Sequence, residues 1–356
     1  MEHNDSKRHG SETDRRAFVK GVALAGAGLA LTSRAGNLLA STVPATAPLS
    51  MAPNWADQIG LELYTVRDLT AKDYLGTLAK VAAIGYKEIE PAGGYANLSP
   101  KQFRAEIDRL RLKMPSTHSG VTIGPDAEME KQFAGFQIMG IEYSSLDQPR
   151  PVGGRSGRPR PATPPTPAEQ RKQMEQFIKN TAQARTVDDV KREAARYNKF
   201  GELAHKFGIK LLVHNHTVEF IPCKDADQLP YTILLTETDP ELVVFQMDIG
   251  WASVAGQNPV QLFQQHPGRF ALWHVKDVAC LKCLPPVPEQ GARMAGARLV
   301  PVGLGEVDYE EIFKYANVAG MKHFVIEQDT AADWGDSIAA ARVSYEHLRA
   351  MLAGRA

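Results

Sequence analysis

The chain has 356 residues, of which 43% are hydrophobic and 23% charged, close to the average for soluble globular proteins. Basic and acidic residues both number 41, so the chain lacks the basic excess typical of a protein that binds nucleic acid. Three cysteines cannot form a disulfide-rich scaffold, and no apolar run reaches the roughly 20 residues of a membrane-spanning helix. These numbers exclude a fibre, a disordered chain, a membrane channel and a small disulfide-stapled protein.

Residues 1–40 have the layout of a signal peptide. Arg15 and Arg16 precede a short apolar stretch, Gly21–Thr32, that is rich in alanine and glycine. The adjacent arginines resemble the twin-arginine type, which predicts export to the periplasm and cleavage near Ala40. The alternative is an amphipathic helix that stays on the protein, but its glycines would weaken such a helix. No cysteine follows the stretch, so we expect no lipid anchor, and residues 41–57 are interpreted as a linker.

From residue 58 to 356, short apolar runs alternate with amphipathic stretches, the pattern of βαβ units. Eight such repeats predict a single (β/α)₈ barrel of the α/β class. The predicted strands are Ile59–Thr65, Lys87–Pro91, Lys113–His118, Ile138–Ser144, Ile209–His216, Val243–Ile249, Phe270–Lys276 and His323–Gln328. The predicted helices are Ala71–Ile84, Ser99–Leu110, Asp126–Gln137, Asp188–Phe207, Pro259–His266, Asp308–Val318 and Ser337–Ala350.

Two stretches interrupt the alternation. Residues 149–167 are rich in proline, glycine and arginine and predict an exposed flexible loop, with binding of an anionic partner as the less favoured alternative. Residues 280–303 predict a second long loop, which contains Cys280-Leu281-Lys282-Cys283. This spacing predicts a loop disulfide or two free thiols, and a catalytic redox role is disfavoured because the thioredoxin context is missing.

Ionisable residues end nearly every predicted strand, and in a (β/α)₈ barrel the active site lies at the carboxyl ends of the strands. Asp248, His274 and Glu327, together with one of His214 or His216, are the candidate metal ligands. Imidazole and carboxylate groups suit Mn²⁺, Fe²⁺, Co²⁺ or Zn²⁺, and the lack of thiolates argues against a structural zinc site. We therefore expect one divalent cation at the mouth of the barrel.

The sequence resembles a known family at these strand ends. The resemblance rests on motifs that occur in order along the chain: Leu63–Arg67, Ile84–Glu90, His214–His216 with Glu219-Phe220, Asp248–Trp251, Pro267–Arg269, His274–Asp277, Gly303–Asp308 and Glu327–Asp329. They resemble the sugar phosphate isomerase/epimerase group of the xylose isomerase-like TIM barrels. The resemblance implies one divalent metal, usually Mn²⁺, held by His214, Asp248, His274 and Glu327, and a small carbohydrate as substrate.

The chain departs from that family at one position. The sugar epimerases typically place a glutamate on strand five, where this chain has His214. The scheme with two glutamates as proton-transfer groups therefore cannot be transferred, and related dehydratases of cyclic keto-polyols also carry a histidine there. The primary prediction is an isomerase or epimerase that acts on a sugar or keto-sugar through an enediolate. A lyase or dehydratase, or a carbohydrate-binding barrel without turnover, is the alternative.

Proton transfer and substrate binding need further side chains. Glu327, Glu219 or His118 is predicted to act as the base that removes the α-proton. The predicted substrate-binding residues at the barrel mouth are Tyr64, Arg67, Glu90, His216, Trp251 and Lys276. Ion pairs with Asp277 or Glu90 are the alternative for Lys276 and Arg67, and core packing is the alternative for Trp251. The sequence leaves open whether the chain forms a homo-oligomer.

Overall fold

The structure is a computed structural model that describes residues 54–147, 185–287 and 289–354, with a few isolated positions between 169 and 180. The predicted signal peptide (1–40), most of the predicted linker (41–57) and the predicted flexible loop (149–167) lie outside the described residues. Among the helices described, none is long and apolar enough to cross a membrane.

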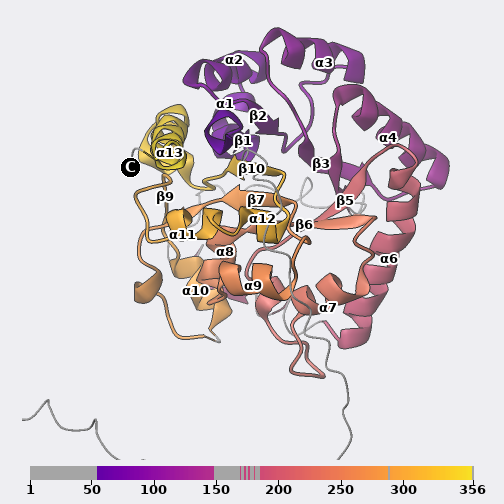
Figure 1. The fold of residues 1–356 in the computed structure, drawn as a ribbon, viewed down its shortest axis with the longest axis vertical. Coiled ribbons are helices and arrows are strands. Elements are labelled where there is room, and N and C mark those ends of the chain that lie inside the picture. The colour runs from indigo at the N-terminus through magenta and orange to yellow at the C-terminus, as the bar shows by residue number, and fades with distance from the viewer. Residues whose placement is uncertain are drawn as a thin grey trace, which may run out of the picture. The chain divides into compact units, whose positions relative to one another are not determined.

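Eight parallel strands form the centre of the described chain, surrounded by helices (Figure 1). Neighbouring strands pair in the order β2-β1-β10-β7-β6-β5-β4-β3. The strands are β1 (Gly60–Glu62), β2 (Glu88–Glu90), β3 (Ser116–Thr122), β4 (Tyr143–Asp147), β5 (Lys210–His214), β6 (Val243–Asp248), β7 (Leu272–Val275) and β10 (His323–Ile326). The predicted (β/α)₈ barrel is confirmed.

The barrel is closed between β2 and β3 by a short contact. A single parallel bridge joins Glu88 to Lys113, just ahead of β3. The backbone N–H of Ile89 donates to the carbonyl of Lys113 at 2.9 Å, and the N–H of Lys113 donates to the carbonyl of Lys87 at the same distance. Farther along, the N–H groups of His118 and Ser119 both donate to the carbonyl of Pro91, at 2.9 and 3.0 Å. This seam therefore has one regular bridge, whereas β5 and β6 pair four residues of each strand.

Helices follow the strands, and their starts show ordinary capping chemistry. Ser99 caps α3 and forms a reciprocal capping box with Gln102, as the Ser99-Pro100 pair suggests. The principal helices are α2 (Tyr74–Ile84), α3 (Pro100–Arg109), α4 (Asp126–Met139), α6 (Val187–His205), α7 (Pro230–Glu237), α9 (Pro259–Gln265) and α13 (Ser337–Leu352). Shorter helices are α1 (Arg67–Thr70), α8 (Ile249–Val254), α10 (Gln290–Gly296), α11 (Tyr309–Phe313) and α12 (Ala316–Ala319).

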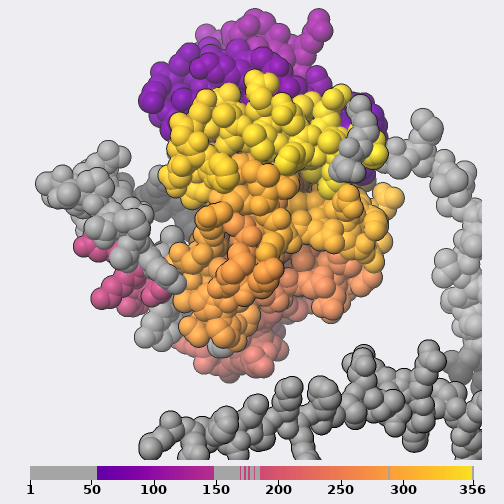
Figure 2. Space-filling view, turned by 90° about the vertical axis from the view of Figure 1, so that its left-hand side faces the viewer, coloured from indigo at the N-terminus to yellow at the C-terminus, as the bar shows by residue number. Residues whose placement is uncertain are grey.

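The first and last parts of the barrel pack against each other. Figure 2 shows the yellow C-terminal segment lying beside the indigo N-terminal one, and α13 contacts α2. The buried hydroxyl of Tyr86 donates to the carbonyl of Ala341 in α13 at 2.8 Å. These contacts hold the final helix over the first strand–helix units.

Several sequence predictions need correction. The first strand is Gly60–Glu62 rather than Ile59–Thr65, because Leu63–Val66 form a 3-10 helix. The fourth strand begins at Tyr143 rather than Ile138, because α4 runs through Met139 and ends at Gly140, whose positive φ of 82° suits glycine. The predicted helix Asp308–Val318 is two helices, α11 and α12. The predicted loop 280–303 contains α10 and β9 (Leu299–Val300), which pairs antiparallel with β8 (Asp277–Val278). Cys280 and Cys283 form a disulfide at the start of this segment.

Candidate metal centre

Four side chains from four strands meet at the carboxyl end of the barrel. They are His214 at the end of β5, Asp248 at the end of β6, His274 in β7 and Glu327 just after β10. One ligand atom from each lies within 4.8 Å of the others. Parallel pairing brings them together, since β6 and β7 place Asp248 directly beside His274. The sequence left His214 and His216 open as the ligand on strand five, and the structure brings His214 into the cluster.

Three of the four candidate ligands hold the protonation state that a metal ligand needs. Burial would lower the pKa of the fourth, His274, but the carboxylates around it, Glu327 first among them, raise that pKa well above its usual value. Burial would raise the pKa values of Asp248 and Glu327, but neighbouring cations, Lys276 first among them, outweigh burial and hold both carboxyl pKa values below their usual range. Burial lowers the pKa of His214 well below its usual value, so this ring is neutral. The two carboxylates and one neutral imidazole are therefore available to a cation.

The donor set fits a divalent ion. Nε2 of His214 is buried without a hydrogen-bond partner and lies 3.6 Å from Oδ2 of Asp248, too far for a hydrogen bond. Nδ1 of His274 lies 3.8 Å from the same oxygen and 2.7 Å from Oε2 of Glu327. Two imidazoles and two carboxylates around one point suit Mn²⁺, Fe²⁺, Co²⁺ or Zn²⁺. Whether this chain binds a metal, and which one, stays a prediction.

Glu90 lies beneath the cluster and is completely buried. One of its oxygens, Oε1, accepts from Nε2 of His274 at 2.8 Å, while Oε2 accepts from Nε2 of Gln246 at 2.7 Å and from the hydroxyl of Ser116. A carboxylate on the far nitrogen of a histidine ligand fixes the ring and its tautomer. The contacts described for Glu90 are therefore those of a residue that orients His274, and the substrate contact predicted for it stays a prediction.

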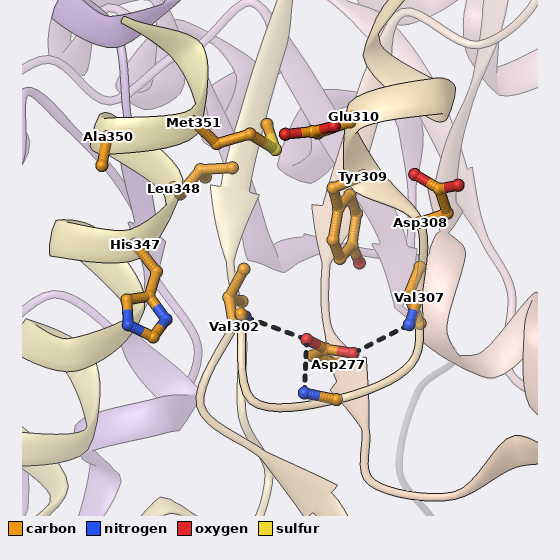
Figure 3. A pocket seen from close by; sticks show the side chains of 12 residues that line it. Asp277, Val302, Val307, Asp308, Tyr309, Glu310, His347, Leu348, Ala350 and Met351 are labelled. Atoms are coloured by element: carbon orange, nitrogen blue, oxygen red, sulfur yellow. Dashed lines mark hydrogen bonds between the residues drawn. The ribbon is translucent and has the colours of Figure 1, made fainter. Parts of the chain in front are cut away.

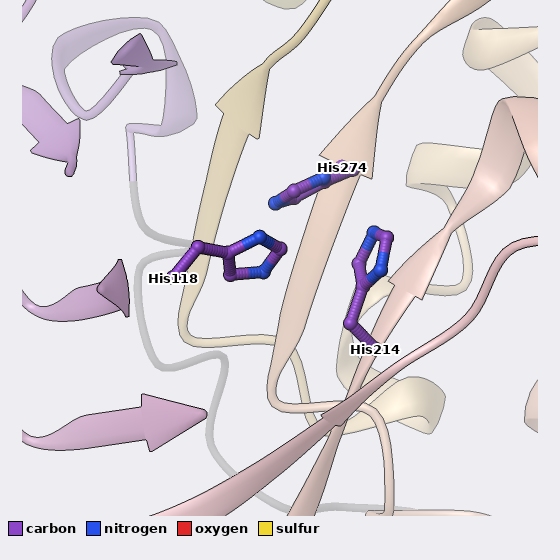
Figure 4. Close-up of side chains that lie close together, drawn as sticks. All are labelled: His118, His214 and His274. Atoms are coloured by element: carbon purple, nitrogen blue, oxygen red, sulfur yellow. The ribbon is translucent and has the colours of Figure 1, made fainter. Parts of the chain in front are cut away.

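His118 is the third histidine of the site. Its Nε2 is 2.5 Å from Oε1 of Gln246, and its ring centroid lies 4.8 Å and 4.9 Å from those of His214 and His274. Figure 4 shows the three rings turned toward one another. The side chain of His118 is partly exposed, unlike that of His274. The predicted base therefore lies beside the candidate metal ligands.

Lys276 is the buried cation of the centre. Its Nζ lies 2.7 Å from Asp248, 2.8 Å from Asp329 and 2.9 Å from Glu327. Burial would lower its pKa, but the three carboxylates raise it well above the usual value. The alternative ion pair with Asp277 is wrong, because Asp277 accepts backbone N–H groups instead.

Trp251 lies next to this lysine and is buried in a small apolar cluster with Val254, Val278 and Leu299. Nζ of Lys276 is 5.0 Å from the centre of its ring, within the range of a cation–π contact. The structure thus places Trp251 in the core, and stacking on a sugar stays a prediction.

The other predicted residues lie outside this cluster. Tyr64 is exposed, and the guanidinium of Arg67 lies 4.0 Å from the centre of its ring, rather than against Glu90. His216 is exposed, with its ring centroid 4.9 Å from that of His214. The carboxylate of Glu219 accepts the backbone N–H of His216 at 2.7 Å, so it stabilises the turn after β5. Their substrate-binding and catalytic roles stay predictions.

Two polar residues of the site, Glu62 and Gln246, were not predicted from the sequence, and Asp329 was predicted only as part of the Glu327–Asp329 motif. Glu62 at the end of β1 pairs in register with Glu90, and burial followed by the charge of Glu90 raises its pKa well above the usual value. Gln246 lies two residues before Asp248 on β6, and Asp329 lies two residues after Glu327. Alternation along a strand puts residues two apart on the same side, a signal that would have identified Gln246.

A separate cavity of about 440 Å³ lies between α11 and α13 (Figure 3). Its lining includes Asp277, Tyr309, His347 and Met351. Asp277 holds the turn below it by accepting the N–H groups of Gly303, Gly305 and Val307. None of the four candidate metal ligands lines this cavity, so we do not assign it to the same chemistry.

Known proteins match both the sequence and the fold. An inosose dehydratase from Clostridium botulinum is 32% identical over 142 residues, which cover 37% of this chain and 45% of the relative, so the match spans about half of that protein. A sugar phosphate isomerase/epimerase from Parabacteroides distasonis has a similar structure, with a TM-score of 0.60 and 21% identity over 86% of this chain and 98% of that one.

A xylose isomerase-like TIM barrel protein from Mycobacterium smegmatis, solved in complex with magnesium, gives a TM-score of 0.50 at 16% identity, over 84% of this chain and 97% of that one. At these identities the structural matches establish the fold alone. The family model of the xylose isomerase-like TIM barrel matches residues 78–351, which is most of the chain. The protein therefore belongs to the xylose isomerase-like TIM barrel family.

Proposed function

We propose that this protein is a metal-dependent enzyme that removes the proton next to the carbonyl of a hydroxy-ketone carbohydrate. The observation that carries the proposal is the convergence of His214, Asp248, His274 and Glu327 within 4.8 Å, with His118 beside them. These four residues would hold a divalent cation, which would supply the Lewis acidity that stabilises an enediolate. Isomerisation or epimerisation of a sugar is the primary outcome that we propose.

The side chains of the site differ in their ability to accept the α-proton. Asp248 and Glu327 are engaged by Lys276 and their pKa values are low, so they are poor proton acceptors. His118 is partly exposed and is the predicted base that the geometry favours, since Glu219 is committed to the turn after β5. A positioned base of this kind typically contributes about 10²–10⁴-fold to the rate.

Dehydration is a second candidate outcome, favoured by two specific observations. His214 stands where the sugar epimerases that the chain resembles typically place a glutamate, and the matched relatives, among them that from Clostridium botulinum, are named as inosose dehydratases. With one base on one face, the protonated base can return the α-proton to the β-hydroxyl, which leaves as water, so dehydration needs no second carboxylate. Lys276 is protonated and lies within the site, so it can stabilise the negative charge that forms there.

Proton NMR in D₂O tests the proposal and separates the outcomes. The purified chain is loaded in turn with Mn²⁺, Mg²⁺, Zn²⁺ or Co²⁺ and incubated with ketohexoses, 3-keto-glucosides and inosose, and the metal is removed before spectra are recorded. Deuterium at the carbon next to the carbonyl supports proton removal. An unchanged formula then indicates an isomerase, and loss of water indicates a dehydratase.

Two variants make the test specific. Glu327→Ala should lower turnover by orders of magnitude in an enzyme, whereas a carbohydrate-binding barrel without turnover should keep most of its ligand affinity if the metal stays bound. Glu311→Ala, which removes an exposed carboxylate paired with Lys314, is the matched control and should leave activity unchanged. No deuterium uptake with any metal and substrate would refute the enolisation proposal.

We also propose that the chain is exported by the twin-arginine route, on the basis of Arg15, Arg16 and the apolar stretch that follows. Export would favour a free or glycosidic keto-sugar as substrate, because sugar phosphates are scarce outside the cytoplasm. Fractionation of cells that express the full chain tests this, with Arg15→Lys/Arg16→Lys as the variant. Equal amounts of both proteins in the periplasm would contradict it.

A further inference from the structure

Gln246 connects two histidines of the site through one carboxylate. Its amide lies between Glu90, 2.7 Å from the amide nitrogen, and His118, 2.5 Å from the amide oxygen. Oε1 of Glu90 also lies 3.4 Å from Nε2 of His118, a longer contact that favours a proton on the same nitrogen. All of these groups are at least partly buried, and the side chain of Glu90 is completely so. The proton positions in this chain of hydrogen bonds follow from which groups can only donate or only accept.

A carboxylate can accept hydrogen bonds and cannot donate them. Glu90 therefore requires the NH₂ group of Gln246 to point toward it, and the amide oxygen of Gln246 must then point toward His118. An oxygen accepts, so Nε2 of His118 must carry a proton. A neutral imidazole holds one proton, and its Nδ1 is left with a lone pair.

The same carboxylate acts directly on the other histidine. Oε1 of Glu90 accepts from Nε2 of His274, while Nδ1 of the same ring lies 2.7 Å from Oε2 of Glu327 and would have to release its proton before it could bind a cation. One buried carboxylate thus orients a ring that binds the cation and, through an amide, a ring that accepts a proton. No hydrogen bond among the described residues engages Nδ1 of His118.

We propose that Glu90, acting through Gln246, fixes the proton of His118 on Nε2 and keeps Nδ1 as the proton acceptor of the reaction. Glu90 and Gln246 are positioning residues in this scheme, since they act through His118. The catalytic part rests on the proposed function, but the tautomer itself is a property of the protein without substrate. The two parts can therefore fail separately.

A substitution at Glu90 should reverse the tautomer. In Glu90→Gln, the oxygen of the new amide still accepts from His274, and its NH₂ group takes the place of Oε2 opposite Gln246. Gln246 must then turn its oxygen toward residue 90 and its NH₂ group toward His118. That group donates, so Nε2 of His118 must accept, and its proton moves to Nδ1.

The exchanged pair should restore the original state. In Glu90→Gln/Gln246→Glu, the carboxylate is at position 246, where it accepts both from the amide at position 90 and from Nε2 of His118. The proton of His118 returns to Nε2. A general loss of packing would not be repaired by a second substitution that adds a buried charge, so rescue separates positioning from a structural role.

NMR of histidine labelled with ¹⁵N reads the tautomer directly. The full chain is loaded with Zn²⁺, which is diamagnetic, at a pH where His118 is neutral, and its signals are assigned by their loss in His118→Asn. We expect protonated Nε2 in the wild type, protonated Nδ1 in Glu90→Gln and protonated Nε2 again in the exchanged pair. Gln290→Met is the control, since Gln290 is equally buried and donates to the carbonyl of Ala255 instead.

Each outcome decides the proposal. The wild-type measurement tests the proposal even if Glu90→Gln does not fold: a His118 ring protonated on Nδ1 in the wild type overturns it. A folded Glu90→Gln protein that keeps the proton on Nε2 overturns it too, as does an exchanged pair that leaves it on Nδ1. Turnover should fall about 10–100-fold in Glu90→Gln and recover in the exchanged pair. Absence of wild-type deuterium exchange would count against the proposed function and leave the tautomer result intact.

Discussion

Replacement of Lys276 by methionine should destabilise the protein without a metal more than the loss of a surface lysine would. The side chain of Lys276 is 1% exposed, and its Nζ lies within 2.7–2.9 Å of three carboxylates. Lys276→Met leaves Asp248, Glu327 and Asp329 without this counterion. Removal of one partner of a buried ion pair typically costs about 3–5 kcal/mol. For a domain of this size that corresponds to a decrease in Tm of roughly 6–10 °C.

A divalent metal should offset part of that loss, because two of the three carboxylates are candidate metal ligands. Binding at about 100 times Kd stabilises a folded protein by about 2.7 kcal/mol. The variant should bind more tightly than the wild type, since the ammonium no longer competes for Asp248 and Glu327. Calorimetry with and without Mn²⁺ should therefore show a larger increase in Tm for the variant.

The matched control is Lys314→Met, which removes an exposed lysine that pairs with Glu311 at 2.9 Å. An exposed pair contributes less than about 1 kcal/mol, so the control should stay close to the wild type. The reasoning is refuted if Lys276→Met is as stable as the control without metal. It is equally refuted if Mn²⁺ raises the Tm of the variant no more than that of the wild type.

Three further perturbations have definite expectations. Gly250→Ala places a Cβ 2.6 Å from the carbonyl oxygen of Lys276. We therefore expect the free energy of unfolding, measured in urea, to fall by about 1–3 kcal/mol and metal binding to weaken. An unchanged free energy and metal affinity would contradict the close approach. Tyr86→Phe removes the hydrogen bond to the carbonyl of Ala341, which keeps its backbone partner within α13, and should cost about 0.5–1.5 kcal/mol in the same assay; unchanged stability would contradict a contribution from this bond. The Cys280–Cys283 disulfide closes only a short loop, so its reduction should lower the free energy of unfolding by about 2 kcal/mol or less and leave metal affinity unchanged. A loss of bound metal on reduction would show that this segment supports the site.

The sequence predicted the barrel well because most of its strands are largely buried and end at, or just before, a polar residue. β6, for example, is buried throughout and ends in Asp248, so hydrophobicity locates the strand and the aspartate marks its end. The fourth strand was misplaced because Ile138 and Met139 extend the apolar pattern of α4 up to Gly140. An apolar run alone does not separate the last turn of a helix from the first residues of a strand.

The candidate site could be predicted only in part from the sequence, because its side chains come from positions far apart along the chain. Glu90 and Gln246 are 156 residues apart, and their contact depends on how β2 and β6 are placed around the barrel. Lys276 was identified as a polar residue at the mouth, but its three partners depend on the same arrangement. Residue types at strand ends therefore indicated the chemistry, while the hydrogen bonds that fix protons and charges required the structure.

β2 and β3 are the two ends of the paired order of strands, and a single regular bridge joins them. Thermal breathing should begin there, because few backbone bonds must break before Glu88 and Lys113 separate. The candidate cation ligands come from β5, β6, β7 and the end of β10, all on the continuously paired part of the wall. The barrel can therefore open between β2 and β3 while the four candidate ligands keep their distances from one another.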